Sequence, residues 1–178
     1  MQTVKIFDKT FSPAISEFDI QEKINTLSEK ISADYATKNP LFIVILNGAF
    51  MFAADLFRNI KIPAEISFVQ LSSYAGIQSS GKIETIFGLK ENIEGRHIII
   101  LDDVLDTGKT LFTFKKEMIQ KKPLSLKTVL LIDKKIDIKY DLVADYACFE
   151  NHKGFLIGYG MDYNGQGRNL PAIYQLNE

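Results

Sequence analysis

The chain has 178 residues, 46% of them hydrophobic and 24% charged, with a formal net charge of −1 at pH 7. This length and composition predict one globular domain over residues 1–178 and argue against extensive disorder. A net charge this close to zero gives no general electrostatic attraction for nucleic acid or for an anionic membrane surface.

The first clear pattern is helical. Apolar residues recur at helical spacing over residues 19–35, which predicts an amphipathic helix, and Asp19 and Glu22 offer cap chemistry at its start. Beyond Pro40, apolar runs alternate with amphipathic segments. Strands are predicted at 41–46, 64–71, 97–101 and 126–132, shorter strands at 145–149 and 155–159, and further helices at 49–59 and 108–120.

This alternation predicts an α/β protein with a mainly parallel, twisted sheet flanked by helices. Such sheets bind ligands outside the carboxyl ends of their strands. The chain breaks at Asn47, Ser72 and Asp102 each follow a predicted strand, so we expect them to converge on one cleft.

The sequence offers little sign of secretion or membrane insertion. Cys148 is the only cysteine, so neither a disulfide framework nor a thiolate zinc site is expected. The N-terminus lacks the apolar core of a signal peptide, and the apolar stretch at 41–57 is too short and too interrupted to span a bilayer. We therefore expect a cytoplasmic protein without a membrane partner.

The segment IIILDDVLDTGKT, residues 98–110, carries the strongest functional signal. Its apolar strand runs directly into Asp102 and Asp103, with Asp106 close behind. Like charges this close repel one another unless a cation or a polyhydroxyl ligand lies among them. The acidic cluster therefore points to a binding site.

The residues that follow predict a phosphate site. Small residues entering a helix leave backbone N–H groups unpaired, and the helix dipole favours an anion there. A nucleotide P-loop is excluded because its first glycine would fall at Asp103, and a D-x-D phosphatase motif is excluded because the two acids are adjacent. The remaining interpretation is a ribose 5-phosphate site, with the phosphate at the turn and the ribose hydroxyls on the carboxylates.

The segment 98–110 resembles the phosphoribosyl-diphosphate motif of type I phosphoribosyltransferases. In that motif, four apolar residues are followed by two acids, two apolar residues and D-T-G-x-T. From about residue 40 onward, four further segments resemble the hypoxanthine (hypoxanthine-guanine) branch of this family: VILNGAFMFAADL, SFVQLSSYAG, LLIDK and FLIGYGMDYNGQGRNLP. The resemblance implies the type I fold with a small hood formed by the chain-terminal segments. It also implies Mg²⁺-dependent purine salvage from 5-phosphoribosyl 1-diphosphate and a 6-oxopurine base.

The resemblance also implies roles for residues of the acidic segment and of the purine side. Asp102 and Asp103 would hold the ribose hydroxyls directly or through magnesium, although the family more often has Glu-Asp here. Asp106 would be the acid/base residue near purine N7. The implied phosphoribosyl contacts are Thr107, Gly108, Lys109 and Thr110. On the purine side, Lys134 would contact the 6-oxo group and Phe155 would stack on the ring. The backbone of Leu156 and the residue Asp162 would also contact the purine.

Three further groups follow from the same resemblance. Leu46, Asn47 and Gly48 resemble the diphosphate loop, in which a cis peptide aims backbone N–H groups at the diphosphate; Asn47 replaces a residue that is often Lys or Thr. Arg168 would bind diphosphate, and Asp162 would ligand magnesium together with Asp102 and Asp103. Ser73 and Tyr74 would begin the mobile lid, and residues 149–154 depart from the family pattern at the purine-pocket rim.

These expectations define a transferase that converts hypoxanthine, and guanine as well, to IMP and GMP. Two alternatives of the same fold stay open: a nucleic-acid-binding regulator that senses phosphoribosyl diphosphate, and a non-catalytic interaction protein. A third alternative is the same reaction with xanthine preferred. No nucleic-acid partner is expected, and the apolar helix at 49–57 predicts a subunit contact in a homodimer or homotetramer.

Overall fold

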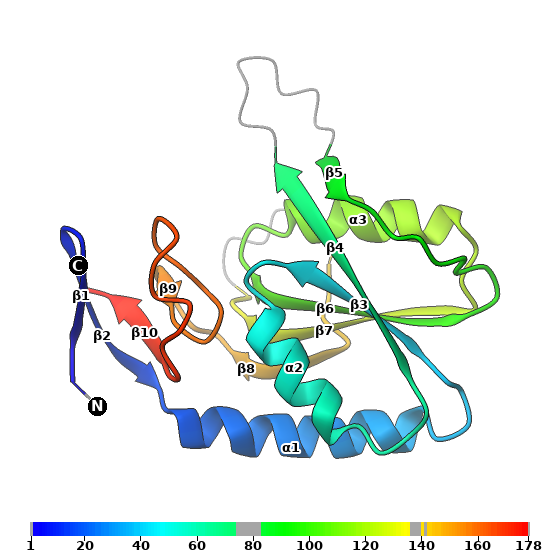
Figure 1. Ribbon diagram of the computed structural model, residues 1–178, viewed down its shortest axis with the longest axis horizontal. Coiled ribbons are helices and arrows are strands. Elements are labelled where there is room, and N and C mark those ends of the chain that lie inside the picture. The colour runs from blue at the N-terminus through cyan, green and yellow to red at the C-terminus, as the bar shows by residue number, and fades with distance from the viewer. Residues whose placement is uncertain (1, 74–82, 136–139, 141, 178) are drawn as a thin grey trace.

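The computed structural model describes residues 2–73, 83–135, 140 and 142–177, and its centre is a six-stranded sheet (Figure 1). The strand order is β5-β4-β3-β6-β7-β8; the last five are parallel, and β5 is antiparallel to its neighbour β4. The strands are β3 (Leu41–Leu46), β4 (Glu65–Ser73), β5 (Ile83–Phe87), β6 (His97–Leu105), β7 (Ser125–Asp133) and β8 (Tyr146–Glu150).

Helices cover both faces of this sheet. α1 (Glu17–Asp34) and α2 (Phe50–Asn59) lie on one face and α3 (Lys109–Gln120) lies on the other (Figure 1). Successive side chains of a strand point to opposite faces, so Phe42 packs in the core under α1 and α2, whereas Ile43 packs in the core under α3. Because both faces are buried, β3 is apolar throughout, as the sequence predicted for a mainly parallel sheet.

The start of α1 differs from the prediction. The helix begins at Glu17 rather than Asp19, and its N-cap is Ser16, whose hydroxyl accepts a hydrogen bond of 3.1 Å from the backbone N–H of Asp19. Asp19 does take part in the cap, because it lies in the first turn and its carboxylate accepts a hydrogen bond from the Ser16 hydroxyl, whereas Glu22 lies beyond the first turn. Ser16 satisfies one of the N–H groups that the first turn leaves unpaired.

The second sheet is the small hood predicted from the chain-terminal segments. It is antiparallel in the order β1-β2-β10-β9 and brings both ends of the chain together beside the main sheet (Figure 1). Its strands are β1 (Val4–Ile6), β2 (Lys9–Ile15), β9 (Leu156–Ile157) and β10 (Ile173–Leu176). It has its own core, in which Phe11 and Ile157 are fully buried.

The central strand β6 is longer than predicted. It does not end at Leu101 but continues to Leu105, still paired with β7 through Asp102 and Val104. The acids therefore lie on the last residues of a strand rather than in the loop after it, because backbone hydrogen bonds to β7 hold the chain extended beyond the apolar run. Among the described residues, no helix is long and apolar enough to cross a membrane.

Candidate active site

Two adjoining cavities lie at the carboxyl ends of the parallel strands. The larger, about 270 Å³, lies between the main sheet and the loop that follows β9. Its lining is Gly48, Asp103, Val104, Asp106, Lys134, Phe155, Leu156, Met161, Asp162 and Arg168. The smaller, about 90 Å³, is lined by Asp102, Val104, Leu105, Asp106, Thr107, Gly108, Lys109, Thr110 and Leu111. Val104 and Asp106 line both, so the two cavities meet along the end of β6.

The two adjacent acids of β6 face different cavities. Asp103 lines the larger one and Asp102 the smaller, as expected for neighbours on an extended strand. The backbone N–H of Asp103 donates to Asp102 Oδ1 at 3.0 Å, and that of Val104 donates to Asp103 Oδ1 at 2.9 Å. Burial raises the pKa of Asp102 well above its usual value, and the charge of Asp103 raises it further. A cation or a hydroxyl donor placed here would relieve both effects.

The connection between β3 and α2 lies against this acidic strand end. The Leu46–Asn47 peptide bond is cis, and Gly48 follows it. A Cβ atom on Gly48 would lie 1.8 Å from Asp103 Oδ2, so a side chain at this position would require the Asp103 carboxylate to move. Asn47 is exposed. Leu46 and Asn47 do not line either cavity; Gly48 is the residue of this loop that does.

The smaller cavity is formed by the turn into α3. Gly108 adopts a left-handed conformation, with φ of 82°, directly before the helix begins at Lys109. Gly108 has no side chain with which to cap the helix, so the first N–H groups of α3 stay available to a ligand. Thr107 and Thr110 line this cavity as well, at the place where the sequence predicted a phosphate site.

Lys134 connects this turn to the opposite wall. From the end of β7, its Nζ donates to Asp106 Oδ1 at 2.9 Å and to the carbonyl oxygen of Gly154 at 2.9 Å. The Lys134 side chain is only 14% exposed, whereas that of Asp106 is 67% exposed. The ammonium group is therefore held in place while the carboxylate remains open to the cleft.

An aromatic side chain forms part of the opposite wall. Phe155 is 45% exposed although it precedes a buried strand residue, Leu156. Its ring packs against Phe11 of the hood, with centroids 6.5 Å apart, and edge-on against Tyr163 at 6.0 Å. These contacts hold the ring while leaving part of it free for a planar ligand.

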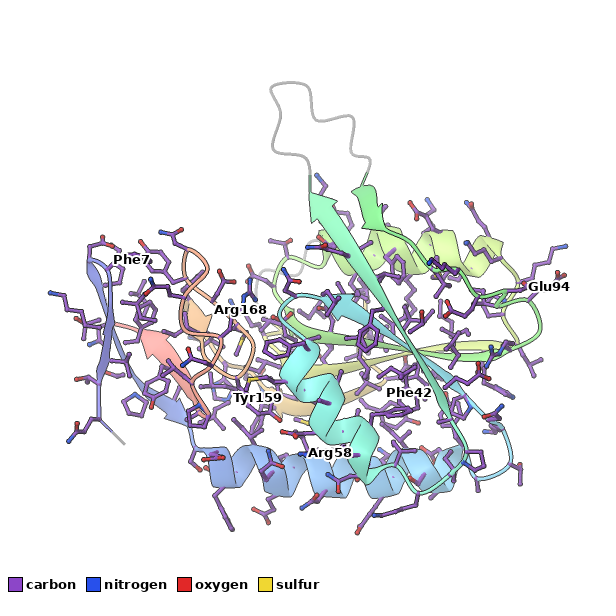
Figure 2. All side chains as sticks on the ribbon, viewed as in Figure 1. Phe7, Phe42, Arg58, Glu94, Tyr159 and Arg168 are labelled. Carbon is purple, nitrogen blue, oxygen red and sulfur yellow. The ribbon has the colours of Figure 1, made fainter. Side chains whose placement is uncertain are left out.

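The loop after β9 carries an acid and an arginine that pair with each other. Arg168 Nη2 lies 2.6 Å from Asp162 Oδ1, and Arg168 Nη1 donates to the carbonyl oxygen of Gly160 at 2.7 Å. The backbone N–H of Gly165 donates to Asp162 Oδ2 at 2.6 Å. Figure 2 labels Arg168 in this loop, which lies between the hood and the end of the main sheet.

Several predicted positions have other outcomes. Ser73 ends β4, and Tyr74 lies outside the described residues. Val104 and Met161 line the larger cavity without having been predicted, because the sequence gives two apolar residues beside charged ones no separate signal. His97, at the opposite end of β6, pairs through Nδ1 with Ser125 Oγ at 2.7 Å.

Comparison with known proteins places this geometry in context. Residues 17–164 match the family model described as the phosphoribosyl transferase domain. The chain is 38% identical over 176 residues to the hypoxanthine-guanine phosphoribosyltransferase of Aquifex aeolicus, covering 98% of this chain and 99% of that one. It is 39% identical over 161 residues to the hypoxanthine-guanine-xanthine phosphoribosyltransferase of Tritrichomonas foetus, covering 90% and 88%.

Solved structures agree with these sequence relatives. A hypoxanthine-guanine phosphoribosyltransferase from Bacillus anthracis superposes with a TM-score of 0.86 and 37% identity, covering 93% of this chain and 98% of that one. A ternary substrate complex of a variant Trypanosoma cruzi hypoxanthine phosphoribosyltransferase gives 0.87 and 33%, covering 93% and 94%.

Proposed function

The chain belongs to the phosphoribosyltransferase family, in its hypoxanthine-guanine branch, and from this premise we propose that it makes IMP and GMP by purine salvage. In this reaction 5-phosphoribosyl 1-diphosphate and hypoxanthine or guanine give the nucleotide and diphosphate. The observation that carries the proposal is the pair of cavities joined along Val104 and Asp106. One cavity is built for a phosphate and the other for a planar base, and the acids of β6 lie between them.

The smaller cavity is assigned to the ribose 5-phosphate. The first N–H groups of α3 and the hydroxyls of Thr107 and Thr110 would hold the phosphate, with Gly108 and Lys109 completing the turn. Asp102 and Asp103 would accept hydrogen bonds from the vicinal ribose hydroxyls. This contact would also compensate the repulsion between the two carboxylates.

The larger cavity is assigned to the purine. The base would stack on Phe155, and the backbone of Leu156 and the Asp162 segment would read its edge. Lys134, already held by the Gly154 carbonyl, would donate to the 6-oxo group. Asp106, which is hydrogen-bonded to Lys134 and open to the cleft, would accept the proton that the base loses near N7.

The diphosphate is assigned to the end of the cleft between Gly48 and Arg168. Backbone N–H groups of the Leu46–Gly48 loop would donate from one side and the Arg168 guanidinium from the other. Arg168 uses two of its five N–H donors on Asp162 and Gly160, so it retains donors for a phosphate. During transfer, ribose C1 loses its bond to the diphosphate oxygen, which keeps the electron pair, and gains a bond to purine N9.

The residues present fit the Mg²⁺ ion that the family uses. Asp103 and Asp162 present carboxylates to the same cavity, and burial, with the neighbouring charge of Asp103, raises the pKa of Asp102. Among the described residues, no set of three or more histidine, cysteine or acidic side chains could hold a metal by itself. Substrate hydroxyl and diphosphate oxygens and water would therefore supply the remaining ligands. When bound, Mg²⁺ neutralises charge on the departing diphosphate.

Two finer points are proposed with the function. The segment that begins at Ser73 and Tyr74 is proposed as a lid that keeps water from the reacting centre. The outer side of α2, where Phe50 is 41% exposed, is proposed as a subunit contact in a homodimer or homotetramer. Sedimentation tests the second point, and a strictly monomeric species would reject it.

A spectrophotometric assay tests the function. Phosphoribosyl diphosphate and Mg²⁺ are supplied with hypoxanthine, guanine, xanthine or adenine in separate reactions. Turnover of hypoxanthine and guanine that stops on chelating Mg²⁺ is the expected result. Xanthine is included because the Tritrichomonas foetus relative is named for it. Absence of turnover with every base would overturn the proposal.

A further inference from the structure

Tyr159 occupies an unusual place for a large side chain. It lies in the tight turn Gly158–Met161, which is closed by hydrogen bonds of 3.0 and 3.1 Å between the backbones of its two end residues. Tyr159 has a φ of +49°, in the left-handed region that favours Gly, Asn or Asp at such turn positions. A bulky residue is retained at this position only if its side chain makes compensating contacts.

The Tyr159 side chain makes those contacts with the two helices on this face of the sheet. It is only 3% exposed, and its hydroxyl donates to Asp55 Oδ2 on α2. The same oxygen accepts a hydrogen bond of 2.9 Å from Gln21 Nε2 on α1, and Asp55 Oδ1 accepts one of 2.5 Å from Arg58. Figure 2 shows Tyr159 between the hood and α2, with Arg168 nearby in the same loop.

The neighbouring residue of the turn connects it to the proposed diphosphate site. A Cβ atom on Gly160 would lie 2.1 Å from the carbonyl oxygen of Gly48, so the two backbones are in direct contact. The N–H of Gly160 donates to the Arg168 carbonyl at 2.9 Å, and the Gly160 carbonyl accepts from the Arg168 guanidinium at 2.7 Å. The turn therefore contacts both Gly48 and Arg168, the two sides of the diphosphate site.

We propose that Tyr159 and Asp55 are positioning residues that set the spacing between Gly48 and Arg168 at the diphosphate end of the cleft. Asp55 lies on α2, the helix that follows the Gly48 loop, and Tyr159 lies in the turn that holds Arg168. Their hydrogen bond closes a ring that runs from Gly48 through α2 to the turn and back to Gly48. This inference rests on the proposed function for the identity of the ligand.

The variant Tyr159→Phe tests the proposal because it removes only the hydroxyl. Tyr146→Phe is the matched control: Tyr146 on β8 donates a 2.7 Å hydrogen bond to Asp34 Oδ2 on α1, but Tyr146 does not belong to the turn that contacts Gly48 and Arg168. Both variants should lose a similar, small amount of thermal stability. Only Tyr159→Phe should weaken the binding of magnesium diphosphate, by about 5- to 10-fold in calorimetry, which corresponds to the net contribution of one typical hydrogen bond.

Kinetics separate positioning from a general structural role. The KM for phosphoribosyl diphosphate should rise about 5- to 10-fold in Tyr159→Phe, while the KM for hypoxanthine should change by less than about twofold. Asp55→Asn retains an acceptor oxygen and should keep the affinity for diphosphate within about twofold of the parent. Asp55→Ala should resemble Tyr159→Phe, and combining the two should add little.

Equal diphosphate affinity in the parent and Tyr159→Phe, or an equal loss in Tyr146→Phe, would overturn the inference. This outcome is distinct from failure of the proposed function. A parent protein that binds magnesium diphosphate but transfers no base would overturn the function and leave the positioning inference open to the calorimetric comparison. A parent protein that does not bind magnesium diphosphate would overturn the inference directly.

Discussion

The two walls of the cleft are built in different ways. The phosphoribosyl wall comes from one contiguous segment, residues 102–111, in which the end of β6 turns directly into α3. The opposite wall, residues 154–170, depends on contacts from far away in the chain: Phe11 of the hood supports Phe155, and Asp55 of α2 holds Tyr159.

One wall of the site is therefore formed by local backbone geometry and the other by long-range packing. A strand–turn–helix segment presents its N–H groups and acids through local backbone geometry, at the end of a strand that is paired with β7. The opposite wall has β9, a two-residue strand, as its only regular element and becomes a defined surface only when the hood and α2 pack against it. The Gly48 loop lies between the two walls, against Asp103 of the contiguous wall and Gly160 of the opposite wall.

The largest expected effect falls on the contiguous wall. Asp106→Asn removes the proposed proton acceptor and should lower kcat by about 10²- to 10⁴-fold. Stability should hardly change because the side chain is 67% exposed, and exposed ion pairs contribute little. Asp8→Asn is the control, since Asp8 is also 67% exposed and paired with a lysine. Retention of more than about a third of the parent kcat would remove Asp106 from the catalytic step.

The next effect breaks the contact between the opposite wall and the Gly48 loop. Gly160→Ala places a Cβ atom 2.1 Å from the Gly48 carbonyl oxygen at a φ of +100°, and should cost about 2–4 kcal/mol of unfolding free energy. Gly165→Ala is the matched control, because its φ is +83° but nothing lies within 4 Å of the added atom. Urea unfolding measures both. Equal losses would show that strain alone, and not the contact with Gly48, is responsible.

A smaller effect should appear in the KM for only one of the two substrates. Phe155→Ala should raise the KM for hypoxanthine about 5- to 100-fold, the range expected for one lost base–aromatic stacking contact. The KM for phosphoribosyl diphosphate should stay within about twofold, because the phosphoribosyl wall is built independently. Phe18→Ala, in a residue that is 75% exposed on α1, should change neither value. A parallel rise in both KM values for Phe155→Ala would contradict the separation.

The smallest effect concerns the charge on the contiguous wall. The pKa of Asp102 is raised in the folded protein, so the folded state binds more protons than the unfolded state above the ordinary aspartate pKa of about 3.9. The free energy of unfolding therefore declines as the pH rises from that value through the folded pKa. Asp102→Asn should lack this decline and be slightly more stable near neutral pH, while binding phosphoribosyl diphosphate more weakly. Urea unfolding across this pH range tests it, and identical pH profiles would contradict it.

The contiguous wall is also the one that the sequence predicts best. Acids after an apolar strand and small residues before a helix are local patterns, and a cavity lies at Thr107–Thr110, where these patterns predicted a phosphate site. The end of β6 was predicted four residues too early because hydrogen bonds to β7, which are not visible in the local pattern, extend the strand. The alternation of apolar strands and helices was sufficient for the five parallel strands of the main sheet, whereas the antiparallel edge strand β5 (Ile83–Phe87) was not predicted.

The opposite wall was predicted only through resemblance. Nothing local shows that Phe155 would be exposed and supported by Phe11, 144 residues earlier in the chain, or that Tyr159 would reach α2. Met161 was missed for the same reason, since one apolar residue between Gly160 and Asp162 carries no pattern. Long-range packing determines the exposure and contacts of these side chains, and the identity of a single residue does not reveal that packing.

A crystal structure with IMP bound would test whether one wall binds the phosphate and the other binds the base, because the nucleotide spans both walls. The account predicts the 5′-phosphate within hydrogen-bonding distance of the N–H groups at residues 107–110. It also predicts the hypoxanthine ring on Phe155, with Lys134 at its 6-oxo group. A phosphate bound elsewhere, or a base that does not contact Phe155, would contradict the account.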